Sequence, residues 1–382
     1  MMRSQGFIAE RAPRTDKLDW PFVIICIALC GIGFVTLYTG SLAYASRLFD
    51  DPLYFVKRQG IILAIGLVSL VIFASVSLDF LRTHLSKLVL ITLIMSILPF
   101  IPGIGITKNG ASRWINLGPM TFQPSELVKM VLVIFLANLF SKKFDRMHEP
   151  EVSVYPATIM SFLMISIVYL QDDFSTALFI IVIALIMFFL AGVKIVWFIK
   201  LCALSLPFII LMVVTREYRV KRVLSFFHPE HDPLGAGYQV NAALTALSEG
   251  GFWGRGLGNG IRKIASIPEV QSDFIFAVWS EEMGFFGVVL YFALLIAFAL
   301  RGFWIALECE DRFRSLMCFG CVSIIFFQSL VNCGVVVRAF PATGIPLPFF
   351  SSGGSSLLIT LCLCGLIINV SRWKNKREMD YV

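Results

Sequence analysis

The chain has 382 residues, of which 58% are hydrophobic and 15% are charged, and its formal net charge is +7. A soluble domain of this length would carry about 25% charged residues, so the composition excludes an ordinary soluble fold. Apolar runs of roughly 18 or more residues recur along the chain, and this length fits the thickness of a bilayer.

Ten such runs follow one another. They lie near residues 20–39, 59–78, 87–105, 124–140, 153–171, 174–193, 195–214, 275–300, 314–337 and 354–371. Because a helix satisfies its own backbone groups in lipid, the sequence predicts an all-α, polytopic transmembrane helical bundle of about ten spans. The first run follows a basic tail, as in a signal peptide, but no small-residue cleavage site follows it, so we expect a retained span.

The Lys and Arg residues of the short loops predict the orientation of the bundle. One side receives basic clusters such as Arg82/Lys87 and Lys142/Lys143, whereas the last loop of the other side holds Arg338 alone. The more basic side is expected to be cytoplasmic.

This orientation divides the chain into three parts. Residues 1–19 and 374–382 are predicted to be cytoplasmic tails, and residues 20–373 to form one transmembrane domain. Within that domain, residues 215–274 are expected to be a large extracytoplasmic loop between spans seven and eight, since long loops translocate largely regardless of charge.

The nine cysteines and four histidines do not predict a disulfide framework or a metal site. Eight of the cysteines fall inside predicted spans, and the histidines are scattered through loops. Cys318 and Cys321 have redox spacing but lie in mid-span without a partner histidine. We expect the cysteines to be small core residues.

Polar residues gather around the start of the fourth span. The preceding loop contains Arg113, and Gln123-Pro124-Ser125-Glu126 leads into a helix on which Glu126 and Lys129 share one face. Two interpretations stay open: an internal ion pair that neutralises itself, or a polar lining that faces a substrate head group. On the second, Arg113, Gln123, Glu126 and Lys129 are candidate substrate-binding residues.

The turn between the fifth and sixth spans sets two acids side by side, Asp172 and Asp173. Compensation of a helix dipole explains one of them. The second repels the first, so a role in substrate or cation binding is the alternative, and Asp173 is the candidate.

The long loop carries cations and a glycine-rich stretch. Arg216 and Arg222 are candidates either for a membrane surface or for a pyrophosphate cradle. Gln239 leads into a short helical stretch over 240–249. The following residues, 250–258, contain Arg255, and their glycines either let backbone approach a ligand or form a mobile linker.

Asp273 stands where this loop meets the eighth span, four residues after Glu269 and ten after Lys263. A carboxylate half-buried at such a boundary has a raised pKa, which suits a general base. The structural alternative is an N-cap on the helix that follows.

Three prolines in eight residues hold segment 341–348 extended, and the chain is expected to re-enter the bundle there. The serines and glycines of 351–356 then begin the last span and leave backbone N–H groups for an anion. Ser351 and Ser355 are the candidate substrate-binding residues of this segment.

Three of these segments together resemble a known family. They are Phe122-Gln123-Pro124-Ser125-Glu126, then Pro268-Glu269 followed by Asp273-Phe274-Ile275-Phe276, and finally Thr343-Gly344-Ile345-Pro346-Leu347-Pro348-Phe349. Their order and topology are similar to those of the SEDS proteins, the polymerases of cell shape, division and sporulation. The resemblance covers the chain from about Trp20 to Trp373.

The resemblance implies a peptidoglycan glycosyltransferase that polymerises lipid II, an undecaprenyl-pyrophosphate disaccharide-pentapeptide, outside the bacterial cytoplasmic (inner) membrane. It also implies a class B penicillin-binding transpeptidase and other divisome or elongasome membrane proteins as partners, with no nucleic acid. The family's essential acid carries over to Asp273. Gly256-Leu257-Gly258 followed by Lys263 resembles the division-type FtsW branch more than the elongation branch.

The implied reaction needs a base and a stabilised leaving group. Asp273 is the candidate catalytic base, and the outer-side cations Arg216, Arg222, Arg255, Arg262 and Lys263 are candidates to stabilise the departing pyrophosphate. No cofactor is firmly implied. A divalent cation could share this work, with Glu269 or Asp172/Asp173 as its ligands.

The chain departs from the family's pattern at three places. Asp172 and Ser175 stand in the turn where the family has Pro and Gly, Gln271-Ser272 replaces His-Thr before the essential acid, and Ser352 replaces a Tyr. Because Asp273 itself is retained, the chemistry is expected to be intact.

Two other functions compete with a polymerase. One is a transporter that flips the lipid-linked precursor, but its site must be accessible from both sides, whereas the polar segments here crowd the outer side. The other is a non-catalytic scaffold for the transpeptidase, which would tolerate loss of Asp273.

Overall fold

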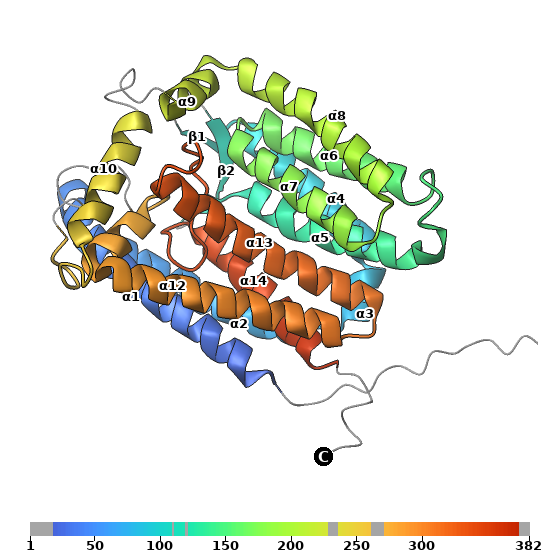
Figure 1. Cartoon of the computed structure of the whole chain (residues 1–382), viewed down its shortest axis with the longest axis horizontal. Helices are drawn as coiled ribbons and strands as arrows, with labels where there is room; N and C mark the ends of the chain where they lie inside the picture. Colours follow the sequence, from blue (N-terminus) through green and yellow to red (C-terminus); the bar gives the residue numbers. More distant parts are fainter. Residues whose placement is uncertain (1–17, 109–110, 119–120, 228–235, 261–270, 374–382) are drawn as a thin grey trace, which may run out of the picture.

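The computed structural model describes residues 18–108, 111–118, 121–227, 236–260 and 271–373. The predicted tails therefore fall almost wholly outside the described residues, as do Arg262, Lys263 and Glu269. Helices packed side by side form nearly the whole molecule (Figure 1).

The helices alternate along the chain with short connections. They are α1 (Trp20–Phe49), α2 (Tyr54–Ser75), α3 (Leu78–Thr83), α4 (Leu85–Ile97), α5 (Pro124–Lys142), α6 (Val154–Leu170), α7 (Phe174–Leu190), α8 (Ile195–Val214), α9 (Glu217–Phe227), α10 (Ala236–Gly250), α12 (Ile275–Glu308), α13 (Arg312–Val336) and α14 (Gly354–Ser371). Short 3-10 turns cover Leu98–Phe100 and Phe144–Arg146.

The predicted class, a helical membrane bundle, is confirmed. In the described part of the chain, seven helices are long and apolar enough to cross a membrane, namely α1, α2, α5, α8, α12, α13 and α14. Three shorter apolar helices, Leu85–Phe100, Val154–Leu170 and Phe174–Leu190, coincide with the other predicted spans. The total of ten spans stays a prediction.

A small antiparallel sheet is the main addition to the predicted fold. Strands β1 (Gly105–Lys108), β2 (Ala111–Asn116) and β3 (Thr121–Phe122) pair in that order between α4 and α5. Ala111 and Ile115 are buried while the residues between them are more exposed. The strand is therefore half-buried, whereas the segment was predicted only as a loop.

The long segment after α8 also contains more helix than expected. α9 was not predicted, and α10 begins at Ala236 rather than near Val240. α10 packs against α12, and its residues Ala243 and Ala246 are buried.

Helix α12 is broken at Gly284, whose backbone is left-handed (φ 62°). Residues 275–282, which precede the break, are all buried in protein, including Glu281 and Glu282. Trp279 spans the break by donating from Nε1 to the carbonyl of Gly287 at 2.9 Å. The break therefore separates a buried first segment from a long second segment that faces lipid on one side.

The glycine-rich loop 250–256 satisfies the backbone groups that the break leaves free. Phe285 and Phe286 donate to the carbonyls of Gly251 and Phe252 at 2.9 and 3.1 Å. In return, the N–H groups of residues 255 and 256 donate to the carbonyls of Glu281 and Glu282 at 3.0 and 2.9 Å. These glycines permit a close approach to another helix of the same chain. The two predicted uses of the glycines, approach to a ligand and a mobile linker, did not include this one.

The proline-rich segment 339–353 runs back into the bundle, as predicted. Leu347 and Phe350 are fully buried, and the carbonyl of Phe349 lies against Gly33 of α1 so closely that no Cβ would fit there. Non-helical backbone is tolerated at this depth only where protein surrounds it.

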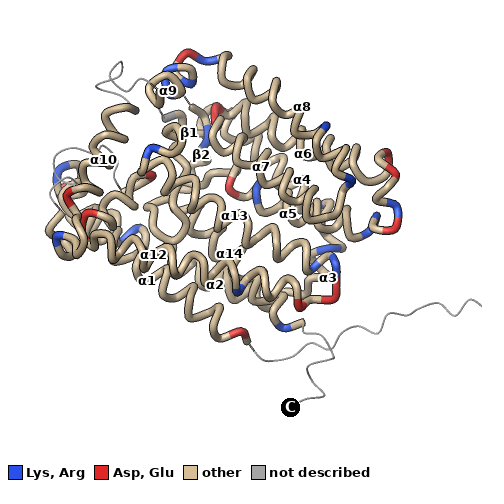
Figure 2. Tube along the Cα trace, viewed as in Figure 1, with Lys and Arg blue, Asp and Glu red and all other residues tan. Residues whose placement is uncertain are grey.

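Charged residues lie mainly at the two ends of the bundle, and the tube between them is nearly free of charge (Figure 2). At one end, Arg301 pairs with Asp19 at 2.6 Å, and Arg314 pairs with Asp79 at 3.5 Å and lies over the ring of Trp373. The start of α1 and the end of α14 thus meet at one end, and Asp273 lies at the other. All nine cysteines are free thiols.

The close packing of loop 250–256 gives a test of the fold. A Cβ at Gly254 (φ 79°) would overlap the carbonyl oxygen of Glu282, whereas a Cβ at Gly251 (φ 55°) would meet nothing within 4 Å. Gly251→Ala should cost only about 1–2 kcal/mol, the cost of a left-handed alanine. Gly254→Ala should cost clearly more, because backbone must also move, and thermal unfolding of both variants in the same detergent measures the difference. Equal melting points would contradict the described pairing of loop and helix.

Candidate active site

Asp273 lies on a short turn immediately before α12, and its side chain is half-buried. The N-cap of α12 is Phe274, whose side chain makes no capping hydrogen bond, so the alternative role of Asp273 as the N-cap residue is wrong. Its Oδ2 lies 3.7 Å from the position that a Cβ would take at Gly344. The carboxylate thus lies beside the re-entrant segment.

Asn332 of α13 fixes both sides of this contact. Its Nδ2 donates to the carbonyl of Asp273 at 2.7 Å and to the carbonyl of Ile345 at 2.8 Å. One turn earlier, Gln328 donates to the carbonyl of Pro346 at 2.9 Å. Side-chain amides of one helix therefore hold the backbone of the candidate base and that of the segment beneath it.

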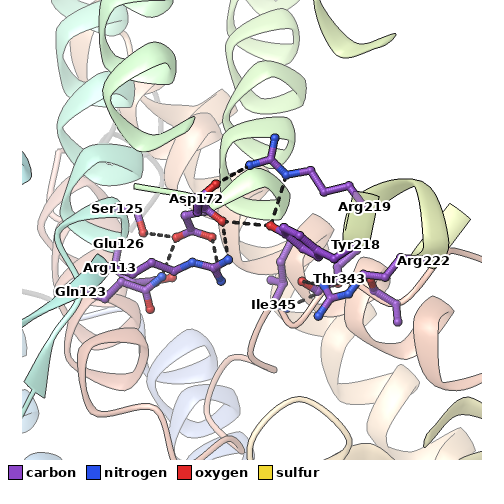
Figure 3. A network of polar contacts seen from close by, with 12 residues as sticks. Arg113, Gln123, Ser125, Glu126, Asp172, Tyr218, Arg219, Arg222, Thr343 and Ile345 are labelled. Carbon is purple, nitrogen blue, oxygen red and sulfur yellow. Dashed lines mark hydrogen bonds and ion pairs between the residues drawn. The ribbon is translucent and has the colours of Figure 1, made fainter. Parts of the chain in front are cut away.

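Arg222 brings a positive charge to the same place. From α9 it reaches the carbonyls of Ala342 and Thr343 at 3.4 and 3.5 Å (Figure 3). Burial lowers the pKa of its guanidinium, the charge of Asp273 raises it and the charge of Arg113 lowers it, with a net lowering. An arginine stays protonated through such a shift, so a permanent cation lies within electrostatic reach of Asp273.

A second arginine, Arg338, lies beside Arg222 and was not among the predicted site residues. The two line a small cavity of about 20 Å³ between α9, α10 and the re-entrant segment. Arg338 donates to the carbonyl of Phe226 at 3.1 Å, and within the described residues no carboxylate lies within ion-pair distance of it. Its backbone is left-handed (φ 57°), which is uncommon for a residue other than glycine. The one feature of the sequence that pointed to Arg338 is that it stands alone as the basic residue of its loop, on the less basic side of the bundle.

Asp173 is buried, and its carboxylate is held from three directions. It accepts hydrogen bonds from Gln123 at 2.7 Å and Ser125 at 2.8 Å, and it pairs with Arg113 at 3.7 Å. A buried carboxylate needs such partners to remain charged. Arg113, Gln123 and Asp173 were predicted substrate-binding residues; the structure brings them together, but as partners of one another.

Asp172 ties the same turn to α9. It pairs with Arg219 at 2.9 Å and with Arg216 at 3.4 Å, and its carbonyl accepts a hydrogen bond from Arg113. Its backbone is left-handed (φ 60°), a conformation closed to proline, so the turn cannot have the same backbone as one with Pro at this position. Arg216, proposed for substrate binding, is therefore engaged with an acid of its own chain.

The Glu126–Lys129 pair is internal. Lys129 lies 2.8 Å from Glu126 and donates to Gln328 at 2.6 Å, and all three side chains are buried. The arrangement matches the first of the two interpretations, a pair that neutralises itself, and it extends through Gln328 to the re-entrant segment. Substrate contact by Glu126 or Lys129 stays a prediction.

The remaining predicted residues are dispersed. Ser351 accepts the N–H of Leu347 at 2.7 Å, and Ser355 accepts the N–H of Gln123 at 2.8 Å, so both tie segments together. Arg255 pairs with Glu249 at 2.9 Å, and Gln239 is half-buried on α10.

Two departures from the family pattern meet in the structure. The N–H of Ser352 donates to the carbonyl of Gln271 at 2.9 Å. The Oε1 atom of Gln271 is buried without a hydrogen-bond partner in the described part of the chain. Both residues lie beside the backbone that carries Asp273.

The possible cation ligands Asp172 and Asp173 fit a metal poorly, since both carboxylates are already paired with arginines. Among the described residues, no three His, Cys, Asp or Glu side chains gather as metal ligands.

The fold and site define a class: a polytopic membrane protein with an acid and two arginines at one end of an apolar bundle. Residues 21–376 match the FtsW/RodA/SpoVE family of cell cycle proteins, and the chain belongs to this family.

Relatives in the family cover almost the whole chain. The chain is 36% identical to a protein of Geobacter sp. (strain M18) named "Probable peptidoglycan glycosyltransferase FtsW", over 94% of this chain and 98% of the relative. It is 37% identical to "Stage V sporulation protein E" of Bacillus subtilis (strain 168), over 93% and 97% of the two chains.

Solved structures agree with the fold. A chain described under "Structural coordination of polymerization and crosslinking by a peptidoglycan synthase complex" superposes with a TM-score of 0.78 at 29% identity, covering 94% of this chain and all of that one. The rod-shape-determining protein RodA of Thermus thermophilus superposes with a TM-score of 0.69 at 26% identity, covering 94% and 99%.

The network around Asp173 predicts a large effect on stability. Asp173→Asn leaves Arg113 without its charged partner and turns an amide toward Gln123 and Ser125, and loss of a buried pair costs about 3 kcal/mol. The matched control is Glu217→Gln, which breaks an exposed pair with Lys221 and should leave the melting temperature unchanged. Thermal unfolding of both variants gives the comparison, and an unchanged melting point for Asp173→Asn would refute the structural role.

Proposed function

We propose that this chain is a peptidoglycan glycosyltransferase that polymerises lipid II at the outer face of the bacterial cytoplasmic membrane, with Asp273 as its base. The observation that carries the proposal is the half-buried carboxylate of Asp273, set beside Gly344 and within electrostatic reach of Arg222. Family membership and the names of the relatives support the activity.

In the proposed reaction, Asp273 takes the proton of an acceptor sugar hydroxyl as that oxygen attacks the anomeric carbon of the donor. A new C–O bond forms there, and the bond from that carbon to the lipid pyrophosphate breaks. Arg222 and Arg338, which line one cavity, lie where cations would stabilise the departing pyrophosphate. A pyrophosphate leaves with its own negative charge, so this step needs cations more than a second acid.

The apolar tail of the substrate needs a groove that opens to lipid. A cavity of about 370 Å³ lies between α6, α7 and α8, with walls that are almost entirely apolar, such as Phe162, Phe188 and Phe208. α8 leads into α9, which carries Arg222. A prenyl chain in this groove would enter from the side of the bundle and place its head near the arginines.

The proposed setting follows the same chemistry. The partner is a class B penicillin-binding transpeptidase, which would crosslink the nascent glycan, and the similar chain from a peptidoglycan synthase complex supports this pairing. We assign the protein to septal synthesis, together with other division proteins, on the FtsW-type names of its relatives.

The first test is polymerisation of purified lipid II by the protein copurified with its transpeptidase, with penicillin present and glycan length read on a gel. Wild type should give long glycan. Asp273→Asn should give none, a loss of at least about a thousandfold, because the base is removed while the shape of the side chain is kept.

The outcomes separate the competing functions. Equal glycan from wild type and Asp273→Asn would remove Asp273 from the mechanism. If an intact wild-type complex gave no glycan from intact substrate, the polymerase proposal would fail in favour of a transporter or a scaffold.

The second test uses the backbone of Arg338. Arg338→Gly relieves the left-handed strain, so stability should stay within about 1 kcal/mol of wild type, while polymerisation should fall at least about tenfold as a pyrophosphate cation is lost. The matched control is Asp50→Gly, since exposed Asp50 has the same backbone conformation (φ 52°) at the end of α1. It should keep full activity. Full activity of Arg338→Gly would exclude this arginine from catalysis.

A further inference from the structure

A further cavity, larger than the two described above, lies at the opposite end of the bundle from Asp273. It has a volume of about 830 Å³ and is bounded by the α3–α4 junction, α5 and α6. Its lining changes along its length, with Arg82, Asn138 and Lys142 at one end and apolar side chains at the other. None of these residues takes part in the site described above.

The polar end holds two cations without acids. Arg82 donates from Nε to Asn138 at 2.9 Å, and its guanidinium lies 5.2 Å from the ring centre of Phe313. In the described ranges, no carboxylate lies within ion-pair distance of Arg82 or Lys142.

Other arginines at this end of the bundle do have acidic partners. Arg301 pairs with Asp19, Arg314 with Asp79 and Arg146 with Glu149. Unlike these three arginines, Arg82 and Lys142 have no acidic partner among the described residues. Lys142 is exposed and Arg82 half-buried, so an anion can reach both.

The apolar end follows α4 away from these charges. Val89 and Leu93 of α4 face Phe135 of α5 and Met160 of α6, while Leu90, 57% exposed, stands at the rim. From Leu85 to Leu93 the helix rises about 12 Å, which suits several methylene groups of an acyl chain. The cavity therefore joins a cationic mouth to an apolar channel that opens sideways to lipid.

We propose that this cavity binds an anionic phospholipid of the leaflet at this end, with its phosphate between Arg82 and Lys142 and an acyl chain along α4. Basic pockets between transmembrane helices on the cytoplasmic side select anionic head groups, and the volume is in the range of ligand sites. The predicted orientation makes this the cytoplasmic leaflet. The site is separate from the polymerase chemistry and does not depend on it.

The experiment is native mass spectrometry of the detergent-purified protein, titrated with phosphatidylglycerol or with phosphatidylcholine of identical acyl chains. Wild type should retain phosphatidylglycerol at least about fivefold better. The double variant Arg82→Gln/Lys142→Gln should lose this preference, because the phosphate loses both cations.

The matched control is Lys87→Gln/Lys143→Gln, which removes two charges at the same end from residues that do not line the cavity. It should keep the preference, and thermal unfolding confirms that both double variants are folded. Leu93→Trp fills the apolar channel and should reduce retention of both lipids.

Three results would overturn the proposal. Equal retention of the two lipids by wild type would mean that the cavity does not select charge, and an equal loss in both double variants would mean that only net charge matters. Displacement of phosphatidylglycerol by an equal concentration of inorganic phosphate would leave a simple anion site in place of a lipid site.

Discussion

The structure depends on one constraint: backbone that is not helical inside an apolar bundle must find its hydrogen bonds in side chains of neighbouring helices. Asn332 meets this constraint for two segments at once, since it donates to the carbonyls of both Asp273 and Ile345. Gln328 of the same helix and Gln59 of α2 serve Pro346 and Ser351 in the same way. These amides fix the re-entrant segment, and through it the floor beneath the carboxylate of Asp273, the proposed base of this peptidoglycan glycosyltransferase.

Charge is organised around the same segment. The carboxylate of Asp173 is enclosed by Gln123, Ser125 and Arg113, and Asp172 anchors α9 through Arg219. The acids of this turn therefore hold the frame, and the arginine that approaches Asp273 is Arg222, which is bonded only to carbonyls of the re-entrant segment among the described contacts.

Much of this arrangement could be predicted from sequence, because hydropathy and basic loops report directly on a membrane bundle. The apolar runs, the re-entry at 341–348 and the half-buried position of Asp273 are all confirmed. Long-range pairing could not be predicted: nothing local says that Arg216 meets Asp172, that Arg255 meets Glu249, or that the loop glycines face α12. Arg338 was overlooked because its left-handed backbone, like the strands of residues 105–122, has no marker in the sequence.

The pairing of loop 250–256 with the broken helix also sets an order of assembly. The loop precedes α12 in the chain, so during synthesis its carbonyls exist before the N–H groups of Phe285 and Phe286 emerge. A second helical segment that begins at the break can therefore enter the membrane with partners already available for its first donors. If the same loop followed α12 in the chain, these N–H groups would stay unpaired in lipid until the loop had been synthesised. The order of the elements along the chain therefore favours correct insertion of the break.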